Sequence, residues 1–383
     1  MLRNKSWAIL LGTAIVLGAA GWWVAASRDQ AAQADFTPKP LFPGLLAKVN
    51  DVDSLEISTP KALFRIEQAD GRWVMPSRGN YPVQPDLVRK NVLGIAGLET
   101  VEPRTDKPEH YDLLQVSDPE KYQPANDAAK SDPGPVLVRL VDRDAKPIAA
   151  VIVGKVKSYA AGGKPGQYHV RKPDEARAWL ASGLLDAKAE PVDWLVRDLI
   201  KIDRNRVAEA VVRHPDGSEL KLVRAAKAGK DAGSADFTPA GMPAGMKIAS
   251  QYDANSVPNV LAWMTFEDVE KAAGRDFSKA TVTELTTLDG LRATIRSIPA
   301  GDGKKGWVTI AVAYEAALVR PDESNQDLLK PDEAEKQAQE AAARLDGWAY
   351  LVSESTLRDL TRQMQDLVEP EKKDEKKDAK KAG

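Results

Sequence analysis

Few residues in this chain combine the type and spacing that catalysis or metal binding needs. The three histidines, His110, His169 and His214, lie far apart, and none belongs to an H-x-x-x-H pair of metal ligands. The 383 residues include no cysteine, which excludes disulfides, thiolate nucleophiles and iron–sulfur clusters. We therefore expect no metal ion and no cofactor.

Two Ser-x-x-Lys sequences match the spacing of serine–lysine hydrolases. They are Ser58–Lys61 and Ser218–Lys221, and both lie in segments with the alternating pattern of strands or hairpins. A serine–lysine nucleophile instead stands at the start of a helix. We therefore assign neither pair a catalytic role.

The remaining polar motifs are typical of turns. The glycine-rich segments 301–306 and 161–168 offer backbone N–H groups to an anion, but each lies between expected strands and no helix follows it. Two aspartate pairs also lie beside expected strands, at Asp51/Asp53 and Asp142/Asp144. No nucleophile elbow or phosphate loop occurs, and segment 301–306, whose glycines have the spacing of a dinucleotide-binding turn, lacks the helix that such a turn opens. We expect a protein that is not an enzyme.

The strongest feature is an uncharged run of twenty residues, Trp7 to Ala26. A helix of this length spans about 30 Å, the thickness of the hydrocarbon core of a bilayer. Arg3 and Lys5 precede the run, which places the rest of the chain across the membrane by the positive-inside rule. The residues that we expect to form this anchor are Trp7, Leu10, Leu11, Gly12, Ile15, Val16, Leu17, Gly18, Gly21, Trp22 and Trp23.

Two other interpretations of this run stay open. A cleaved signal peptide would use the A-x-A-like site at Ala32–Gln33–Ala34, although its apolar core is usually shorter. A buried helix of a soluble protein is the other alternative. The formal net charge of −2 gives no global field that would attract nucleic acid.

Composition and pattern along the chain predict two folded units after the anchor. We expect an anchor over residues 1–27, a proline-rich spacer over 28–44, α+β units over 45–190 and 195–368, and a disordered charged tail over 369–383. Each unit has the pattern of an antiparallel sheet with packed helices. The similar order of elements favours an internal duplication, and chance similarity of two α+β domains is the alternative.

Hydrophobic periodicity predicts the helices. Apolar spacing indicates helices over 85–101 and 256–272, another that starts near Pro173–Asp174, and a strong helix former over 331–347. A last helix, capped by Ser353 or Ser355, follows an expected strand.

Turn signals predict the strands. Asp142–Asp144, Pro215–Gly217 and Asp289–Gly290 each separate two alternating segments, which indicates hairpins. Residues 102–135 contain six prolines and many acidic residues, which predicts a long surface loop.

Several local patterns together resemble a known family. They are LFPGLL (41–46), GRWVMP (71–76), EHYDLLQVSDP (109–119), YHVR (168–171) and WLVRDLIKIDRNRVAEAVV (194–212). The chain resembles, over residues 41–370, the bacterial family called domain of unknown function 4340. Where that family tends to have Tyr-Gly-Leu, this chain has Tyr111–Asp112–Leu113. The resemblance implies an inner-membrane-anchored periplasmic protein, similar to those found beside gliding-motility-type ABC transporter components, and it implies no catalytic residues.

The leading hypothesis is a non-enzymatic accessory or scaffold protein of an ABC-type transport complex, in contact with the bilayer and with permease or auxiliary subunits. The alternative is a periplasmic binding module for a glycan, lipid or peptide, for which Trp73, Trp179, Trp263 and Trp307 are candidate contacts. A hydrolase is the third class, and it would need acidic or Ser/His residues converging in one pocket.

Overall fold

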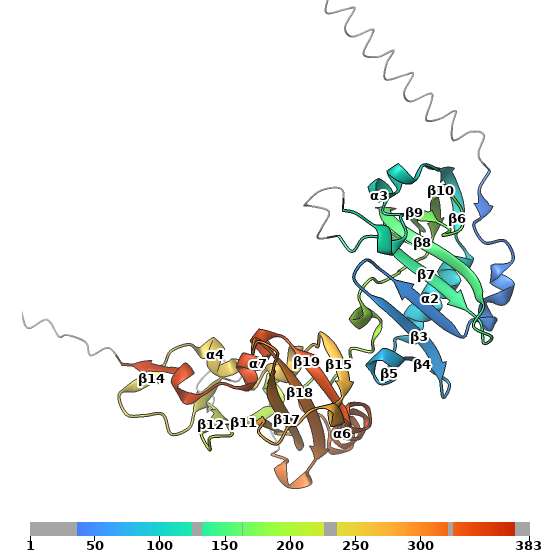
Figure 1. The fold of residues 1–383 in the computed structure, drawn as a ribbon. Helices are drawn as coiled ribbons and strands as arrows, with labels where there is room; N and C mark the ends of the chain where they lie inside the picture. Colours follow the sequence, from blue (N-terminus) through green and yellow to red (C-terminus); the bar gives the residue numbers. More distant parts are fainter. Residues whose placement is uncertain (1–36, 125–131, 163, 226–235, 321–324, 372–383) are drawn as a thin grey trace, which may run out of the picture. The chain divides into compact units, whose positions relative to one another are not determined.

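The computed structural model describes residues 37–124, 132–162, 164–225, 236–320 and 325–371 (Figure 1). The expected anchor, from Trp7 to Trp23, lies outside these residues, as do Arg3, Lys5, the alternative cleavage site and the tail from residue 372. Within the described ranges, no helix has both the length and the apolar character needed to cross a bilayer.

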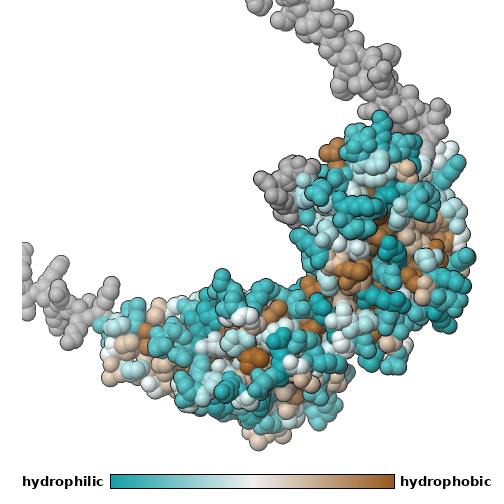
Figure 2. All heavy atoms as spheres, in the orientation of Figure 1, coloured by the Kyte–Doolittle hydropathy of each residue, from teal (hydrophilic) through white to brown (hydrophobic). Residues whose placement is uncertain are grey.

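The fold is mixed α+β with two large antiparallel sheets. The chain divides into two compact units, one that ends at Leu195 and one that begins at Val196. We call them unit 1 and unit 2. On the face drawn in Figure 2, hydrophilic residues cover most of the surface of each unit, with separate hydrophobic patches between them.

Unit 1 contains a sheet of ten strands, all of them antiparallel to their neighbours. In spatial order they are β1 (Lys39–Pro40), β6 (Glu99–Pro103), β10 (Ala178–Gly183), β9 (Gly166–Arg171), β8 (Pro147–Ser158), β7 (Val136–Val141), β2 (Ser54–Ser58), β3 (Leu63–Ala69), β4 (Arg72–Met75) and β5 (Tyr81–Pro82). Two-residue periodicity buries one face: Leu55 and Ile57 of β2 are inaccessible to solvent, and Ile57 pairs with Phe64 of β3.

Helix α2 (Pro85–Ala96) begins with proline in its first turn and buries Val88, Val92 and Ile95. The helix passes very close to the chain that follows β10. A Cβ atom placed on Gly94 would lie only 2.2 Å from the Leu184 carbonyl oxygen. Glycine at position 94 therefore permits this close approach.

The segment expected as a long surface loop, 102–135, is partly folded onto the sheet. It contains η3 (Pro108–His110), α3 (Tyr111–Leu114) and η4 (Pro119–Lys121). Tyr111 and Val116 are buried and belong to a cluster with Leu137 and Ile152 of β7 and β8. The prediction of a long surface loop is therefore wrong for this part of the segment, because the prolines begin short helical turns. Other short turns in the described part of unit 1 are η1 (Leu45–Asp51), η2 (Pro76–Arg78) and η6 (Pro191–Trp194).

Arg171 at the end of β9 holds this segment in place. Its Nε donates to the Val116 carbonyl at 2.8 Å and its Nη2 donates to Asp118 Oδ1 at 2.7 Å. The guanidinium also lies 4.6 Å from the centre of the Tyr111 ring. The buried Arg171 thus connects the sheet to the 108–122 segment.

The helix expected to start near Pro173–Asp174 does not form. The residues concerned make β10, which pairs with β9 on one side and β6 on the other. Ala178 and Leu180 favour a helix by intrinsic propensity, but here they form a strand. Both are buried, and strand pairing on two sides outweighs the local preference.

Unit 2 contains an antiparallel sheet of eight strands. In spatial order they are β13 (Phe237–Pro239), β12 (Glu219–Arg224), β11 (Val207–Arg213), β16 (Thr281–Thr287), β17 (Leu291–Ala300), β18 (Lys305–Tyr314), β19 (Trp348–Val352) and β15 (Asp268–Lys271). A separate pair is formed by β14 (Met246–Ile248) and β20 (Val368–Pro370). The three hairpins expected in the chain are confirmed, with turns at 142–144, 215–217 and 289–290.

The helices of unit 2 are α4 (Gln251–Ser256), α5 (Val260–Trp263), α6 (Pro331–Leu345) and α7 (Glu354–Leu360), with short turns η7 (Arg204–Arg206), η8 (Ala272–Gly274), η9 (Ala316–Leu318) and η10 (Met364–Asp366). Helices α6 and α7 both pack on β17 and β18. The expected helix over 331–347 and the Ser353 cap of α7 are confirmed. The helix expected over 256–272 is wrong in its second half, where Val269 pairs with Tyr350 in a strand.

A buried ion pair ties the start of β11 to the β16–β17 turn. Arg206 Nε donates to Asp289 Oδ2 at 2.7 Å, and both side chains are at least nine-tenths buried. The same carboxylate accepts hydrogen bonds from the Thr287 hydroxyl and from the Leu329 backbone N–H, just before α6. Three separate parts of unit 2 therefore converge on Asp289.

The two sheets share one topology. From β6 to β4, unit 1 has the order β6-β10-β9-β8-β7-β2-β3-β4, and unit 2 has the order β15-β19-β18-β17-β16-β11-β12-β13. Numbered along the chain within each unit, both read 4-8-7-6-5-1-2-3. Helix α2 and the pair α4–α5 both stand between the third and fourth strands. Helix α7 follows the eighth strand of unit 2, whereas the described residues after the eighth strand of unit 1 form no α-helix.

The strands at the sheet edges are short. Strands β1 and β5 have two residues each, β13 has three, and β15 has four. The first three end in proline, at Pro40, Pro82 and Pro239. Residues 39 and 40, which the sequence assigned to a spacer, therefore belong to the sheet of unit 1.

Candidate binding site

A pocket of about 350 Å³ lies between helices α4–α5 and α7 of unit 2. We call it the aromatic pocket, because Tyr252 and Trp263 contribute to its lining. These side chains are 83% and 80% exposed, whereas Phe237, Phe266 and Tyr350 of the same unit are fully buried. Burying a large apolar side chain contributes about 1.5–3 kcal/mol, so the fold leaves this contribution unused at both positions.

The helices place both rings outward by their spacing. Helix α4 is capped at its N-terminus by Ser250, whose hydroxyl accepts a hydrogen bond from the Asp253 N–H at 3.2 Å. Ala254 and Asn255 then face the interior, which leaves Tyr252 on the solvent side. In α5, Val260 to Ala262 are buried and Trp263 at the end of the helix is exposed.

Polar contacts fix the two walls of the pocket to each other. The Ser256 hydroxyl of α4 donates to Asp359 Oδ1 of α7 at 2.9 Å. Arg362, with a side chain only 8% exposed, donates both to Asp359 and to Asp253. A buried cation between two carboxylates therefore connects the two walls of the pocket.

The lining residues differ in whether their hydrogen-bonding groups are already used within the fold. Asn255 is used, since its carbonyl oxygen accepts a hydrogen bond from the Phe237 N–H at 2.9 Å. In the part of the chain that the structure describes, the side chains of Asn259 and Arg358 have no hydrogen bond or ion pair. Each is therefore available to a ligand.

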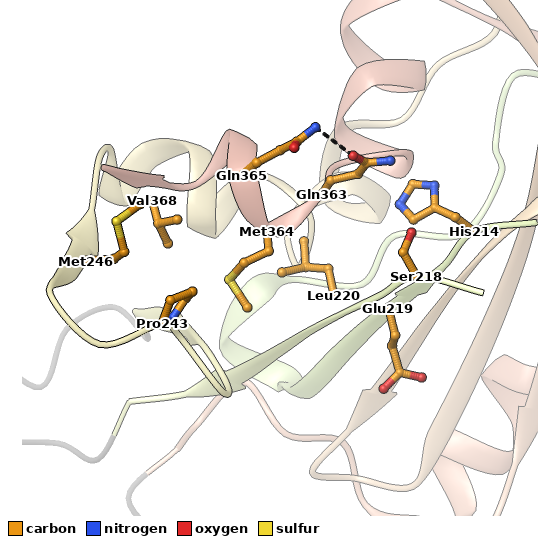
Figure 3. Close-up of a pocket in the computed structure, with 10 residues that line it drawn as sticks. All are labelled: His214, Ser218, Glu219, Leu220, Pro243, Met246, Gln363, Met364, Gln365 and Val368. Atoms are coloured by element: carbon orange, nitrogen blue, oxygen red, sulfur yellow. Dashed lines mark hydrogen bonds between the residues drawn. The ribbon is translucent and has the colours of Figure 1, made fainter. Parts of the chain in front are cut away.

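A second concavity, of about 410 Å³, lies between the β11–β12 turn and the β14–β20 pair (Figure 3). We call it the methionine groove, because Met246 and Met364 line it together with Leu220, Pro243 and Val368. Its polar groups are partly satisfied within the protein: Gln365 donates to Gln363 at 2.8 Å, and His214 Nε2 lies 3.2 Å from the Arg362 carbonyl oxygen. The aromatic pocket offers more groups for specific recognition.

The three histidines lie on separate elements. His110 is exposed in η3, His169 lies in β9 of unit 1, and His214 borders the methionine groove of unit 2. Burial lowers the pKa of His169, although its contact with the Lys155 carbonyl, at 3.0 Å, opposes this shift. The described ranges contain no group of three His, Asp or Glu side chains arranged to hold a metal ion.

Both serine–lysine pairs lie in a hairpin or a strand. Ser58 is in β2, and Ser218 closes the β11–β12 turn, where its hydroxyl donates to Asp216 Oδ1 at 2.7 Å. Likewise, residues 301–304 form the turn between β17 and β18, and residues 305 and 306 begin β18.

The structure does bring the aspartate pairs near each other. Asp51, Asp142 and Asp144 line one shallow pocket, and Arg143 lies 4.0 Å from Asp53. Asp142 Oδ1 accepts the backbone N–H groups of Asp144 and Lys146 at 2.9 and 2.8 Å, so it closes a turn. This arrangement supports hairpin formation.

Of the four candidate tryptophans, Trp263 is the one that lies open to solvent. Trp307 is buried, with the Arg275 guanidinium 4.0 Å from the centre of its ring, and Trp73 and Trp179 are half-buried. Sequence reasoning did not select Tyr252, Asn259 or Arg358. Tyr252 could have been found from its aromatic side chain and its position on the polar side of a helix. Nothing in the sequence indicates that α5 and α7 are in contact.

Comparison with known proteins gives a family. The family model described as Domain of unknown function (DUF4340) matches residues 73–289. This range is more than half of the chain, which therefore belongs to that family, as the resemblance predicted. The matched range includes α4 and α5 and ends before α7. No curated protein and no solved structure matches.

Proposed function

We propose that this member of the DUF4340 family is a non-enzymatic accessory protein of an ABC-type transport complex, anchored in the inner membrane by Trp7–Ala26, which binds the transported cargo from the periplasm. The aromatic pocket is its binding site. The observation that carries this proposal is the exposure of Tyr252 and Trp263 beside polar groups whose hydrogen-bonding capacity is unused. Binding pockets combine such apolar surfaces with a few placed polar groups.

The rigid construction of the pocket supports binding. Arg362 and the Ser256–Asp359 hydrogen bond hold α4 against α7. A site that is organised in advance loses less conformational entropy when the ligand arrives. The location of the whole protein rests on the uncharged run and on Arg3 and Lys5.

The shared strand order supports an origin of the two units by duplication. Eight strands follow the same spatial order in both, with a helical segment at the same place in each. Helix α7 has no counterpart among the described residues of unit 1, and it forms one wall of the aromatic pocket. In this proposal, unit 2 acquired its binding site where α7 was added to the shared sheet.

Co-purification tests the proposal. The full-length protein, solubilised in detergent, should be recovered together with transporter subunits and with cargo. The double variant Tyr252→Ala, Trp263→Ala should keep the subunits and lose the cargo. Tyr159→Ala is the matched control, because this ring is 80% exposed on unit 1 and far from the pocket in sequence.

Repeated recovery of the wild-type protein without transporter subunits would contradict the transport role. In that case, the aromatic pocket would favour the alternative function, a periplasmic binding module that acts without a transporter. Loss of cargo from Tyr159→Ala to the same extent as from the double variant would contradict the assignment of the site.

A further inference from the structure

The side chains that line the aromatic pocket define the chemistry of its ligand. Hydroxyl and amide groups predominate, from Ser256, Asn259, Thr265, Ser353 and Thr356. Val260 and Met264 add little apolar surface beside the two exposed rings. A lipid chain would leave the side chains of Asn259 and Arg358, which have no hydrogen bond or ion pair among the described residues, without partners, which is costly. The lining instead suits a ligand with both hydroxyl groups and an apolar C–H face.

A sugar ring has these two properties. Its axial C–H groups pack on the face of an aromatic ring, while its hydroxyl groups exchange hydrogen bonds with amides and guanidinium groups. Tyr252 and Trp263 come from different helices, so the pocket offers two aromatic surfaces to one ligand. The exposure of both rings follows from this role, since a ligand would cover them.

The charges of the pocket favour an anionic sugar. Arg204 and Arg358 line it, and Asp359 is the one carboxylate among the described lining residues. Asp359 already accepts hydrogen bonds from Ser256 and from the buried Arg362, which offsets its charge. A guanidinium group binds a carboxylate through two parallel hydrogen bonds.

We infer that the aromatic pocket binds a carboxylate-bearing saccharide, with the sugar ring against Trp263 or Tyr252 and its carboxylate paired with Arg358. This inference rests on the proposed function, because it names the class of cargo that the same site takes. A peptide and a neutral saccharide are the competing ligands.

Titration of the full-length protein in detergent tests the inference. The probes are a short oligomer of galacturonic acid and, as the neutral comparison, maltotriose. Binding is followed by calorimetry and by quenching of tryptophan fluorescence. We expect the acidic probe to bind at least about tenfold more tightly than the neutral one, and its affinity to fall as salt is raised.

Variants separate the two parts of the site. Trp263→Ala should weaken binding of the acidic probe about tenfold or more, and Arg358→Gln should remove most of the preference for it. Tyr159→Ala and Arg89→Gln are controls, since both side chains are largely exposed on unit 1. Because Trp263 and Arg358 are exposed, neither variant should alter the unfolding transition of unit 2.

The outcomes distinguish this inference from the proposed function. Equal binding of both probes, or an Arg358→Gln variant that keeps the preference, would overturn the acidic specificity. If neither probe binds while the aromatic double variant still loses cargo, the saccharide inference fails and the proposed function stands. If the acidic probe binds but no transporter subunit co-purifies, the inference stands and the transport role fails.

Discussion

Replacing Arg171 with methionine should release the 108–122 segment from unit 1 and leave the sheet in place. Methionine keeps the unbranched apolar stem but loses every donor. The guanidinium donates to the Val116 carbonyl at 2.8 Å and to Asp118 at 2.7 Å, and Nη1 lies 3.1–3.3 Å from three further carbonyl oxygens. Its side chain is only 6% exposed, so water does not replace these bonds.

The two short bonds determine the magnitude. Hydrogen bonds to charged groups contribute about 1.5–3 kcal/mol each, and the longer bonds add little. Asp118 is 28% exposed, which lowers its share. The loss should therefore be about 3–5 kcal/mol, as for removal of one partner of a buried ion pair. For a unit of this size, the melting temperature should fall by about 6–20 °C.

Hydrogen exchange and calorimetry of the full-length protein measure this effect. Peptides from 108–122 should lose protection in Arg171→Met, and the lower of the calorimetric transitions should belong to unit 1. Arg177→Met is the control, because Arg177 pairs with Asp106 at the surface, with 43% and 48% exposure. Its cost should stay below about 1 kcal/mol. Equal effects of the two variants would refute the role of Arg171 as the connection between sheet and segment.

Three further results are expected. Burial raises the pKa of Asp118, but hydrogen bonds from Lys121 and Arg171 lower it by more, so the folded pKa lies below the ordinary value of about 3.9. The contribution of Asp118 to stability is therefore complete above that value, and protection of 108–122 should be lost as the pH falls through the folded pKa. Gly94→Ala should destabilise unit 1 by about 1–3 kcal/mol in urea, since its Cβ would overlap the backbone after β10. Asp289→Ala should destabilise unit 2 by about 3–5 kcal/mol, because it leaves the buried Arg206 without its carboxylate.

Each of these has a control. Gly274→Ala should change stability by less than about 0.5 kcal/mol, because the nearest atom to its Cβ is the end of a flexible side chain at 3.6 Å. Glu219→Ala breaks only an ion pair that is about half exposed and should cost less than about 1 kcal/mol. For the Asp118 prediction, Arg171→Met is the control: its hydrogen-exchange protection of 108–122 should change less on acidification than that of the wild type. If a variant and its control changed stability to a similar extent, burial of the substituted side chain would not determine the loss of stability.

Local pattern predicted the hairpins and helices α2, α6 and α7, because their turns, caps and periodicity lie within a few residues of one another. Strand β10 was predicted as a helix, since the residues after Pro173 favour a helix locally. What makes it a strand is pairing with Thr100 and neighbouring residues of β6, far away in the sequence. No local pattern carries that information.

The same limit applies to the candidate site. Trp263 was selected from the sequence by residue type, yet three other tryptophans were equal candidates, because burial depends on tertiary packing. Arg358 entered the site only because α7 packs beside α5. Arg171 shows the opposite case: it belongs to the YHVR pattern of the family resemblance, and the structure gives that arginine a physical role.

Two sheets of one topology in a single chain are each a possible template for the strands of the other. Exchange of strands between the units, or between neighbouring molecules, would begin at a sheet edge, where backbone N–H and C=O groups are unpaired. Pro40, Pro82 and Pro239 have no N–H to offer, and the edge strands that contain them are only two or three residues long. At the fourth edge, β15 (Asp268–Lys271) carries three charged residues in four. These edges therefore oppose domain swapping and aggregation. They allow two such similar sheets to form from consecutive parts of one chain without pairing strands of different units.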